Sequence, residues 1–428
     1  MNKNKTLSSV ILWSVISAAF IGPGTVTTAA TAGSLFQLNL LWAVTFATIA
    51  CIVLQEVSGR LTIVSGMTMG QALTKKYGEQ QSSWLKFLLG GPVILGCAAY
   101  EAGNILGAVS GLNLMSSIDT KILTIIITAA SAFILWSGKR NTIGWLMTFL
   151  VFLMGVAFFA LAIDTSFSFQ EYLKSSLTPQ LPVGSELLTL GLVGTTIVPY
   201  NVFLGSGISK GQTVPLMRIG LTISVLIGGL ITAAILVAGT SVRSFSNFNE
   251  LAQALVENSG PIGGWALGIG LFAAGFSSAI TSPYAASIIT SSVFNWNEQK
   301  QRIVWIFVLL VGFAFGISEV KPIPVILAVQ ALNGLVLPLL TAYLILLIND
   351  PAIVPSEHRP SPFYNVVLLI IFGSVLLMGL NNIDKSVSSW VAMPTGHIML
   401  ISTISIALTG YLALKLFAWN KKNNGTRF

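Results

Sequence analysis

The stretch Ile21-Gly22-Pro23-Gly24-Thr25 lies in the middle of an apolar segment at about residues 9–36. This segment is long enough to cross a bilayer as a helix. Pro23 lacks a backbone N–H and crowds the preceding turn, and the flanking glycines favour non-helical dihedral angles. We therefore predict that the helix breaks here, near the bilayer midplane, where only protein or a water-filled cavity can cover unwound backbone. The alternative is a simple proline kink.

The composition is that of a polytopic membrane protein. Hydrophobic residues make up 54% of the chain and charged residues only 8%, with a mean hydropathy of +0.82. A soluble domain carries about 25% charged residues. The basic residues that give the net charge of +8 are expected in cytoplasmic loops rather than at a nucleic-acid interface. The only two cysteines, Cys51 and Cys97, lie in apolar segments, so we expect neither a disulfide framework nor a metal-ligand cluster.

Twelve apolar segments have spanning length, and short connections join them into one integral domain, residues 1–428. They lie at about 9–36, 40–61, 86–113, 121–137, 141–163, 185–208, 217–240, 263–293, 303–317, 324–348, 363–380 and 397–419.

Charge placement gives the orientation. With a cytoplasmic N-terminus, five of the 22 basic residues are external, namely Lys121, Lys174, Arg243, Lys321 and Lys385, and the other 17 are cytoplasmic. This bias follows the positive-inside rule. We therefore expect a multi-pass protein of the cytoplasmic membrane with both termini in the cytoplasm.

A second break is expected in the sixth segment, five segments after the first. It reads Gly194-Thr195-Thr196-Ile197-Val198-Pro199-Tyr200-Asn201. Interrupted helices at corresponding positions of two halves indicate an inverted-repeat secondary transporter. The repeats would be residues 9–163 and 185–348, with the segments within 363–419 as additions. A channel or a purely structural role is the alternative.

Several runs of residues follow the pattern of one known family: Gly33, Leu41-Trp42, Leu54-Gln55, Ser58, Arg60-Leu61, Gly66, Pro199, Asn201, Ala273-Ala274-Gly275 and residues 330–338. In these runs the chain resembles the natural resistance-associated macrophage protein (Nramp) family of metal-ion transporters. The resemblance implies an all-α, leucine-transporter-like 5+5 inverted repeat with its first and sixth helices broken.

The chain departs from the family pattern at the metal site. The family's Asp-Pro-Gly-Asn appears as Gly22 to Thr25, and its Met-Pro-His-Asn as Val198 to Asn201. Val336 stands where the family has a glutamine, and the acidic pair of the third helix becomes Glu101 and Asn104. Transition metals need anionic or soft ligands, so we expect no transition-metal site.

The altered site favours a small oxyanion. The second halves of the two broken helices direct free N–H groups and about half a positive charge each towards the midplane. Bicarbonate is the first candidate, and nitrate, formate or a small carboxylate fit as well. The predicted substrate-binding residues are Gly22, Pro23, Gly24, Thr25, Thr28, Thr195, Thr196, Val198, Tyr200 and Asn201. For the threonines, helix packing is the alternative explanation.

A coupling cation is expected, because an anion that enters against a negative-inside potential needs about 2.3 kcal/mol per 100 mV. Ser277, Ser278, Thr281 and Ser282 recur at helical spacing in the eighth segment. In the leucine-transporter-like fold such hydroxyls and unwound carbonyls bind sodium, so sodium is the candidate coupling ion. The alternative is serine-rich helix packing.

The remaining polar residues complete the prediction. Glu101, in the middle of the third segment, is costly to bury, so Glu101 and Asn104 are assigned to ion coupling or proton relay. A structural partner for Glu101, such as a backbone break or Asn104, is the alternative. Glu56 and Arg60 are spaced for an i, i+4 salt bridge. His358 and His397 are expected to be surface residues.

No catalytic constellation is present, so we expect no enzyme and no cofactor. The expected partners are a small inorganic ion and the lipid bilayer, not nucleic acid, and a monomer is compatible with the sequence. The alternative substrate is a divalent cation, magnesium or manganese. The alternative class of protein is a channel or a sensor that does not transport.

Overall fold

The computed structural model describes residues 3–138, 140–163, 167–242, 245–318, 320–321, 336–391 and 397–424, and these residues form helices without any strand. The first half contains α1 (Lys3–Phe20), α2 (Pro23–Phe36), the 3-10 helix η1 (Gln37–Leu40), α3 (Leu41–Ser65), α4 (Met69–Asn113), α5 (Thr120–Ser137), α6 (Arg140–Ile163) and α7 (Phe169–Leu177).

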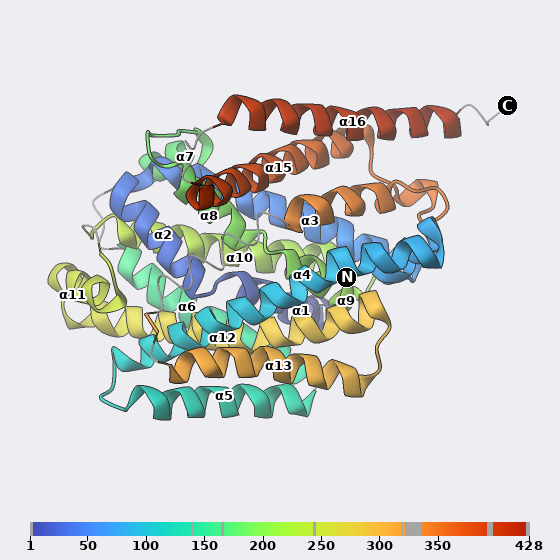
Figure 1. Ribbon diagram of the computed structural model, residues 1–428. Helices are drawn as coiled ribbons and strands as arrows, with labels where there is room; N and C mark the ends of the chain where they lie inside the picture. Colours follow the sequence, from blue (N-terminus) through green and yellow to red (C-terminus); the bar gives the residue numbers. More distant parts are fainter. Residues whose placement is uncertain are drawn as a thin grey trace.

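The second half continues the bundle (Figure 1). It contains α8 (Glu186–Thr196), α9 (Pro199–Ser209), α10 (Val214–Gly239), α11 (Phe248–Ser259), α12 (Pro261–Phe294), α13 (Glu298–Ile317), a short apolar helix Val336–Ile348, the 3-10 helix η2 (Ser356–His358), α15 (Pro362–Val391) and α16 (Ile398–Asn424).

Ten stretches in the described part of the chain are long and apolar enough to cross a membrane, where the sequence predicted twelve. The first two predicted segments are represented by one stretch, Pro23–Ser65, because the break separates α1 from it. The tenth predicted segment, 324–348, is described only from Val336 to Ile348, and residues 324–335 lie outside the described part. The chain is an all-helical, multi-pass membrane protein.

Both predicted breaks are present. Helix α1 ends at Phe20 and α2 begins at Pro23, while α8 ends at Thr196 and α9 begins at Pro199. Gly22 has φ −99° and ψ 179°, and Val198 has φ −82° and ψ 132°, so the backbone is extended at both positions. Each proline takes the first position of the following helix, where its missing N–H costs no helical hydrogen bond. These are true interruptions rather than kinks.

The centre of the bundle is packed closely through small residues. A Cβ added to Gly275 of α12 would lie 2.3 Å from the Ala108 backbone nitrogen of α4, so these two helices touch through their backbones. Small residues allow such approach in membrane helices. Figure 1 shows α15 and α16 along one edge of the bundle and α5 and α13 along the opposite edge. These outer helices expose apolar side chains such as Phe133 and Ile406.

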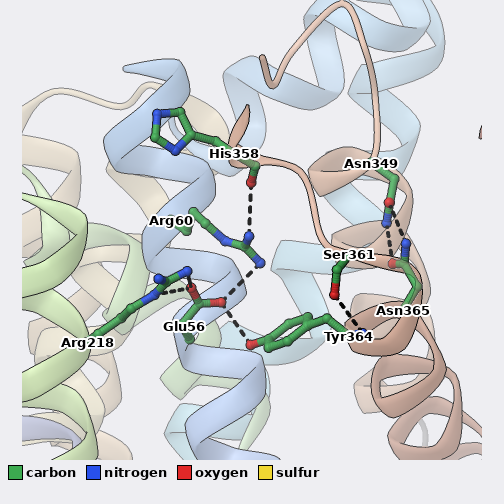
Figure 2. A network of polar contacts seen from close by, with 8 residues as sticks. All are labelled: Glu56, Arg60, Arg218, Asn349, His358, Ser361, Tyr364 and Asn365. Atoms are coloured by element: carbon green, nitrogen blue, oxygen red, sulfur yellow. Dashed lines mark hydrogen bonds and ion pairs between the residues drawn. The ribbon is translucent and has the colours of Figure 1, made fainter. Parts of the chain in front are cut away.

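A network of charged and polar residues joins the three helices α3, α10 and α15 (Figure 2). The predicted pair is confirmed, since Arg60 Nη2 lies 3.2 Å from Glu56 Oε2 on α3. The same carboxylate accepts hydrogen bonds from Arg218 Nη2 of α10 at 2.7 Å and from the Tyr364 hydroxyl of α15 at 2.9 Å. Arg60 also donates to the His358 carbonyl at 2.9 Å. The network ties α3, α10 and α15 to the segment that precedes α15.

The histidines and the cysteines differ in burial. The side chains of His358 and His397 are exposed, as predicted, and His397 Nδ1 lies 2.7 Å from Asp384 Oδ1. Cys51 and Cys97 are free and buried. Within the described residues, no three His, Cys, Asp or Glu side chains gather into a group that could hold a metal ion.

Candidate ion-binding site at the two helix breaks

The two breaks meet at a small cavity. Its volume is about 30 Å³, room for about two water molecules, so it suits a small ion rather than an organic substrate. Eight predicted site residues line it together: Gly22, Gly24, Thr25, Asn104, Thr195, Val198, Tyr200 and Ser278. The lining also includes Ala19, Phe20, Tyr100 and Gly103, which the sequence did not single out.

The other predicted residues lie outside this lining: Pro23, Thr28, Thr196, Asn201, Glu101, Ser277, Thr281 and Ser282. Pro23 packs against Gly107 of α4, where an added Cβ would lie 2.2 Å from the Pro23 ring. The Thr28 methyl group lies against Gly191 of α8. Asn201 is fully buried, and its amide atoms have no hydrogen-bond partner among the described residues.

The break in α1 leaves three successive carbonyl groups without helical donors, and side-chain hydroxyls take their place. Ser277 and Ser278 of α12 donate to the Ala18 carbonyl at 3.2 and 3.3 Å. The Tyr200 hydroxyl donates to the Ala19 carbonyl at 2.8 Å, and the Thr25 hydroxyl donates to the Phe20 carbonyl. Buried carbonyls need such partners. These hydroxyls therefore stabilise the unwound end of α1.

The threonines of α8 are also engaged. Thr195 and Thr196 each donate to the Leu192 carbonyl at 3.1 Å, within their own helix. Thr27 likewise donates to the Pro23 carbonyl at 2.9 Å. Helical threonines commonly bond back in this way. For Thr196 and Thr27, this geometry agrees with the packing interpretation rather than with a role at the cavity.

Backbone N–H groups remain as donors at the cavity. In α2 the Val26 N–H makes the first bond, to the Gly22 carbonyl, so the N–H groups of Gly24 and Thr25 precede the helical ladder. In α9 the Asn201 N–H bonds to the Val198 carbonyl, and the Tyr200 N–H precedes it. The first N–H groups of a helix have no acceptor within it and carry partial positive charge. The arrangement can therefore hold an anion.

Glu101 lies beside the cavity, fully buried on α4. Its Oε2 accepts a hydrogen bond from Asn104 Nδ2 at 3.2 Å, the structural contact that the sequence offered as an alternative. Its Oε1 has no partner among the described residues. Gly312 of α13 packs on the side chain, since an added Cβ there would lie 2.6 Å from Glu101 Cγ. A half-satisfied buried carboxyl is expensive, and it can accept a proton or a cation.

The four hydroxyl residues of α12 separate into two groups. Ser277 and Ser278 face the Ala18 carbonyl, where oxygen atoms from two elements converge. Ser282 instead donates to the Cys97 carbonyl of α4 at 2.8 Å, and Thr281 lies 3.5 Å from the Ser278 carbonyl. Oxygen-only ligands suit a hard cation.

Tyr100 is the one of the four missed lining residues whose side chain carries a polar group. It precedes Gly103 and Asn104 by three and four positions, so the three share one face of α4. Its ring packs edge-on against Tyr200, with centroids 5.9 Å apart and planes at 79°. The spacing to Asn104, which was predicted, is the signal that could have found it.

Comparison with known proteins gives the family. Residues 14–383 match the family described as natural resistance-associated macrophage protein-like. The chain belongs to the Nramp family. Membership confirms the expected family and, since this is a family of transporters, that the chain is not an enzyme.

The relatives of this Nramp chain are distant. A divalent metal cation transporter of Caldanaerobacter subterraneus subsp. tengcongensis is 22% identical over 85% of the chain and 90% of that protein. One from Agrobacterium fabrum is 27% identical, and the match covers 64% of each protein, slightly less than two thirds of the relative. The metal transporter Nramp6 of Arabidopsis thaliana is 23% identical over 94% of the chain and 81% of its own length.

Solved structures agree in fold. A mutant of the Eremococcus coleocola manganese transporter superposes with a TM-score of 0.77, covering 97% of this chain and 94% of its own, at 18% identity. The same transporter bound to an aromatic bis-isothiourea compound gives a TM-score of 0.76. The Nramp chain therefore has the leucine-transporter-like fold of these proteins.

Proposed function

We propose that this chain is a secondary transporter that carries a small ion by alternating access around the cavity between the two breaks. Residues 1–428 form one unit, in which residues 9–163 and 185–348 are inverted repeats and the helices within 363–419 are additions. Family membership and the two proline breaks, at Pro23 and Pro199, support this mechanism.

For the substrate, the proposal is a small oxyanion, with bicarbonate first. The observation that carries it is the lining of the cavity, which contains no carboxylate, thioether or imidazole among the described residues. Gly22 and Val198 stand where the family pattern has Asp and Met, so the ligands for a transition metal are replaced by groups without charge or a soft donor. Two helix N-termini then face the ion without an offsetting negative charge.

A divalent cation is the second candidate, and kinship favours it. The three relatives described above are named as transporters of metals or of divalent metal cations. In this structure the carboxyl of Glu101, next to the cavity, is the group that a cation would use. A hydrated ion such as magnesium keeps several waters and needs few carboxylates.

Sodium is the proposed coupling ion for oxyanion uptake. The hydroxyl oxygens of Ser277 and Ser278 each lie within hydrogen-bond distance of the Ala18 carbonyl oxygen. A cation there would take over the role that the hydroxyl protons have in satisfying the carbonyl. Its charge would also offset the cost of moving an anion into the cell.

The proposed location is the cytoplasmic membrane, with both termini in the cytoplasm, as the distribution of basic residues supports. A monomer is compatible with this mechanism.

Uptake into proteoliposomes tests the substrate. Labelled bicarbonate, manganese and magnesium are compared with and without an inward sodium gradient. We expect saturable bicarbonate uptake that requires sodium. Metal uptake without any anion uptake overturns the oxyanion in favour of the divalent cation, and steady conductance without a coupling ion indicates a channel.

A further inference from the structure

Among the described residues, one hydroxyl at the cavity has no hydrogen-bond partner. The hydroxyls of Thr25, Thr195, Tyr200 and Ser278 all donate to backbone carbonyls. The Tyr100 hydroxyl is buried, and it has no hydrogen-bond partner among the residues that the structure describes. Buried polar groups in folded proteins are nearly always satisfied, so each exception calls for an explanation.

The position of Tyr100 is fixed by its surroundings. It belongs to α4, which packs along α12 in the centre of the bundle, and its ring is held edge-on against the ring of Tyr200. Gly103 and Asn104, one turn further along α4, line the same cavity. The side chain is therefore presented to the cavity by a rigid helix rather than by a loop, which is how a group that binds a ligand is held in place.

We propose that the Tyr100 hydroxyl donates a hydrogen bond to the transported ion and makes the cavity selective for ions that carry acceptor oxygens. The inference rests on the proposed oxyanion transport. The ion would be held between backbone N–H groups at the starts of α2 and α9 and the Tyr100 hydroxyl of α4. A phenol donates well to an anion, whereas it offers a metal cation only a neutral oxygen.

A purely structural role for Tyr100 predicts something different. The ring packs against Tyr200, and this contact requires the aromatic carbons but not the oxygen. Tyr100→Phe keeps the ring and removes only the hydroxyl. If packing were the whole role of the residue, the variant would transport like the parent, and relief of an unpaired buried hydroxyl would leave it at least as stable.

The test measures uptake by Tyr100→Phe in proteoliposomes, using bicarbonate, nitrate and formate as probes. Loss of a hydrogen bond to a charged ligand predicts a roughly 10- to 100-fold rise in KM for the transported oxyanion. The sodium concentration for half-maximal uptake, measured at saturating oxyanion, stays unchanged. Tyr411→Phe is the matched control, because Tyr411 is an exposed residue of α16, and both variants are compared with the parent for their midpoint of thermal unfolding.

The outcomes separate the two proposals. If the parent protein takes up an oxyanion and Tyr100→Phe has the same KM, the role of Tyr100 is wrong and the proposed function stands. If the parent protein takes up only metal ions, the proposed function and the role of Tyr100 are both wrong. A raised KM with an unchanged unfolding midpoint supports both.

Discussion

At the scale of single residues, we propose that Gly22 leaves the site without a negative charge. It lies in extended backbone at a negative φ, which any residue can adopt, so its role is not conformational freedom. A Cβ added there would lie 3.0 Å from Ser278 Oγ and 3.7 Å from Asn104 Oδ1, pointing towards the cavity lining. A side chain at position 22 would therefore reach the ion itself.

Gly22→Asp should convert the site from one that attracts anions to one that repels them. The new carboxylate would lie at the start of α2, where it neutralises the partial positive charge of the helix end. We expect oxyanion uptake to fall at least 10-fold, and binding of manganese, measured by isothermal titration calorimetry, to become detectable or stronger. Gly22→Ala is the control, because it adds the same Cβ without charge. Equal oxyanion uptake by the Asp and Ala variants would contradict the helix-end site.

At the scale of the element, the unwound end of α1 depends on hydroxyls from other helices. The carbonyls of Ala18, Ala19 and Phe20 would lose their donors in any isolated broken helix. Here Ser277 and Ser278 of α12 donate to the Ala18 carbonyl, and Tyr200 of α9 donates to the Ala19 carbonyl. Thr25 of α2 donates to the Phe20 carbonyl. The unwound end of α1 is thus held by three other elements.

Replacing both Ser277 and Ser278 by alanine should raise the sodium requirement of uptake. The double variant removes two oxygen ligands but keeps the Ala18 carbonyl, so sodium binding is weakened rather than abolished. We expect the sodium concentration for half-maximal uptake to rise about 100-fold, as the two lost contacts to an ion cost about 1.5 kcal/mol each and every 1.4 kcal/mol is tenfold. Ser291→Ala is the control, since its hydroxyl donates to Ile288 within the same helix. An unchanged sodium dependence would leave only the packing role.

The network around Glu56 holds α3, α10 and α15 together (Figure 2). The Glu56 and Arg60 side chains are only 8% and 7% exposed, whereas Arg218 is 53% exposed. Glu56→Gln leaves the Arg60 guanidinium buried without its counter-charge, which costs about 3 kcal/mol. We expect Glu56→Gln to lower the midpoint of thermal unfolding in detergent. Glu257→Gln is the control, because Glu257 is exposed, and we expect it to change the midpoint little. Equal midpoints for the two variants would show that the network does not stabilise the fold.

At the scale of the whole molecule, features that depend on neighbouring residues could be predicted from the sequence, whereas contacts between distant residues could not. Pro23 and Pro199 reveal the two breaks because proline acts on its own turn. Glu56 and Arg60 were paired from their spacing, but Arg218 and Tyr364 lie 162 and 308 positions away from Glu56, and no sequence pattern joins them to it. Whether the hydroxyl of Tyr100 or that of Tyr200 is engaged depends equally on distant carbonyls. The sequence could therefore predict the two breaks that line the cavity. It could not predict which hydrogen-bond donors there are engaged within the protein and which are left for an ion.

The orientation of the whole chain can be tested by single cysteines. Cys51 and Cys97 are 1% and 0% exposed, so labelling of the parent protein by a membrane-impermeant maleimide should be low. Val183, between α7 and α8, is 98% exposed and external in the proposed topology, while Lys5 is exposed at the start of α1 and cytoplasmic. In intact cells we expect Val183→Cys to be labelled and Lys5→Cys to be protected until the membrane is permeabilised. The reverse pattern would invert the topology and place the 17 basic residues outside, against the positive-inside rule.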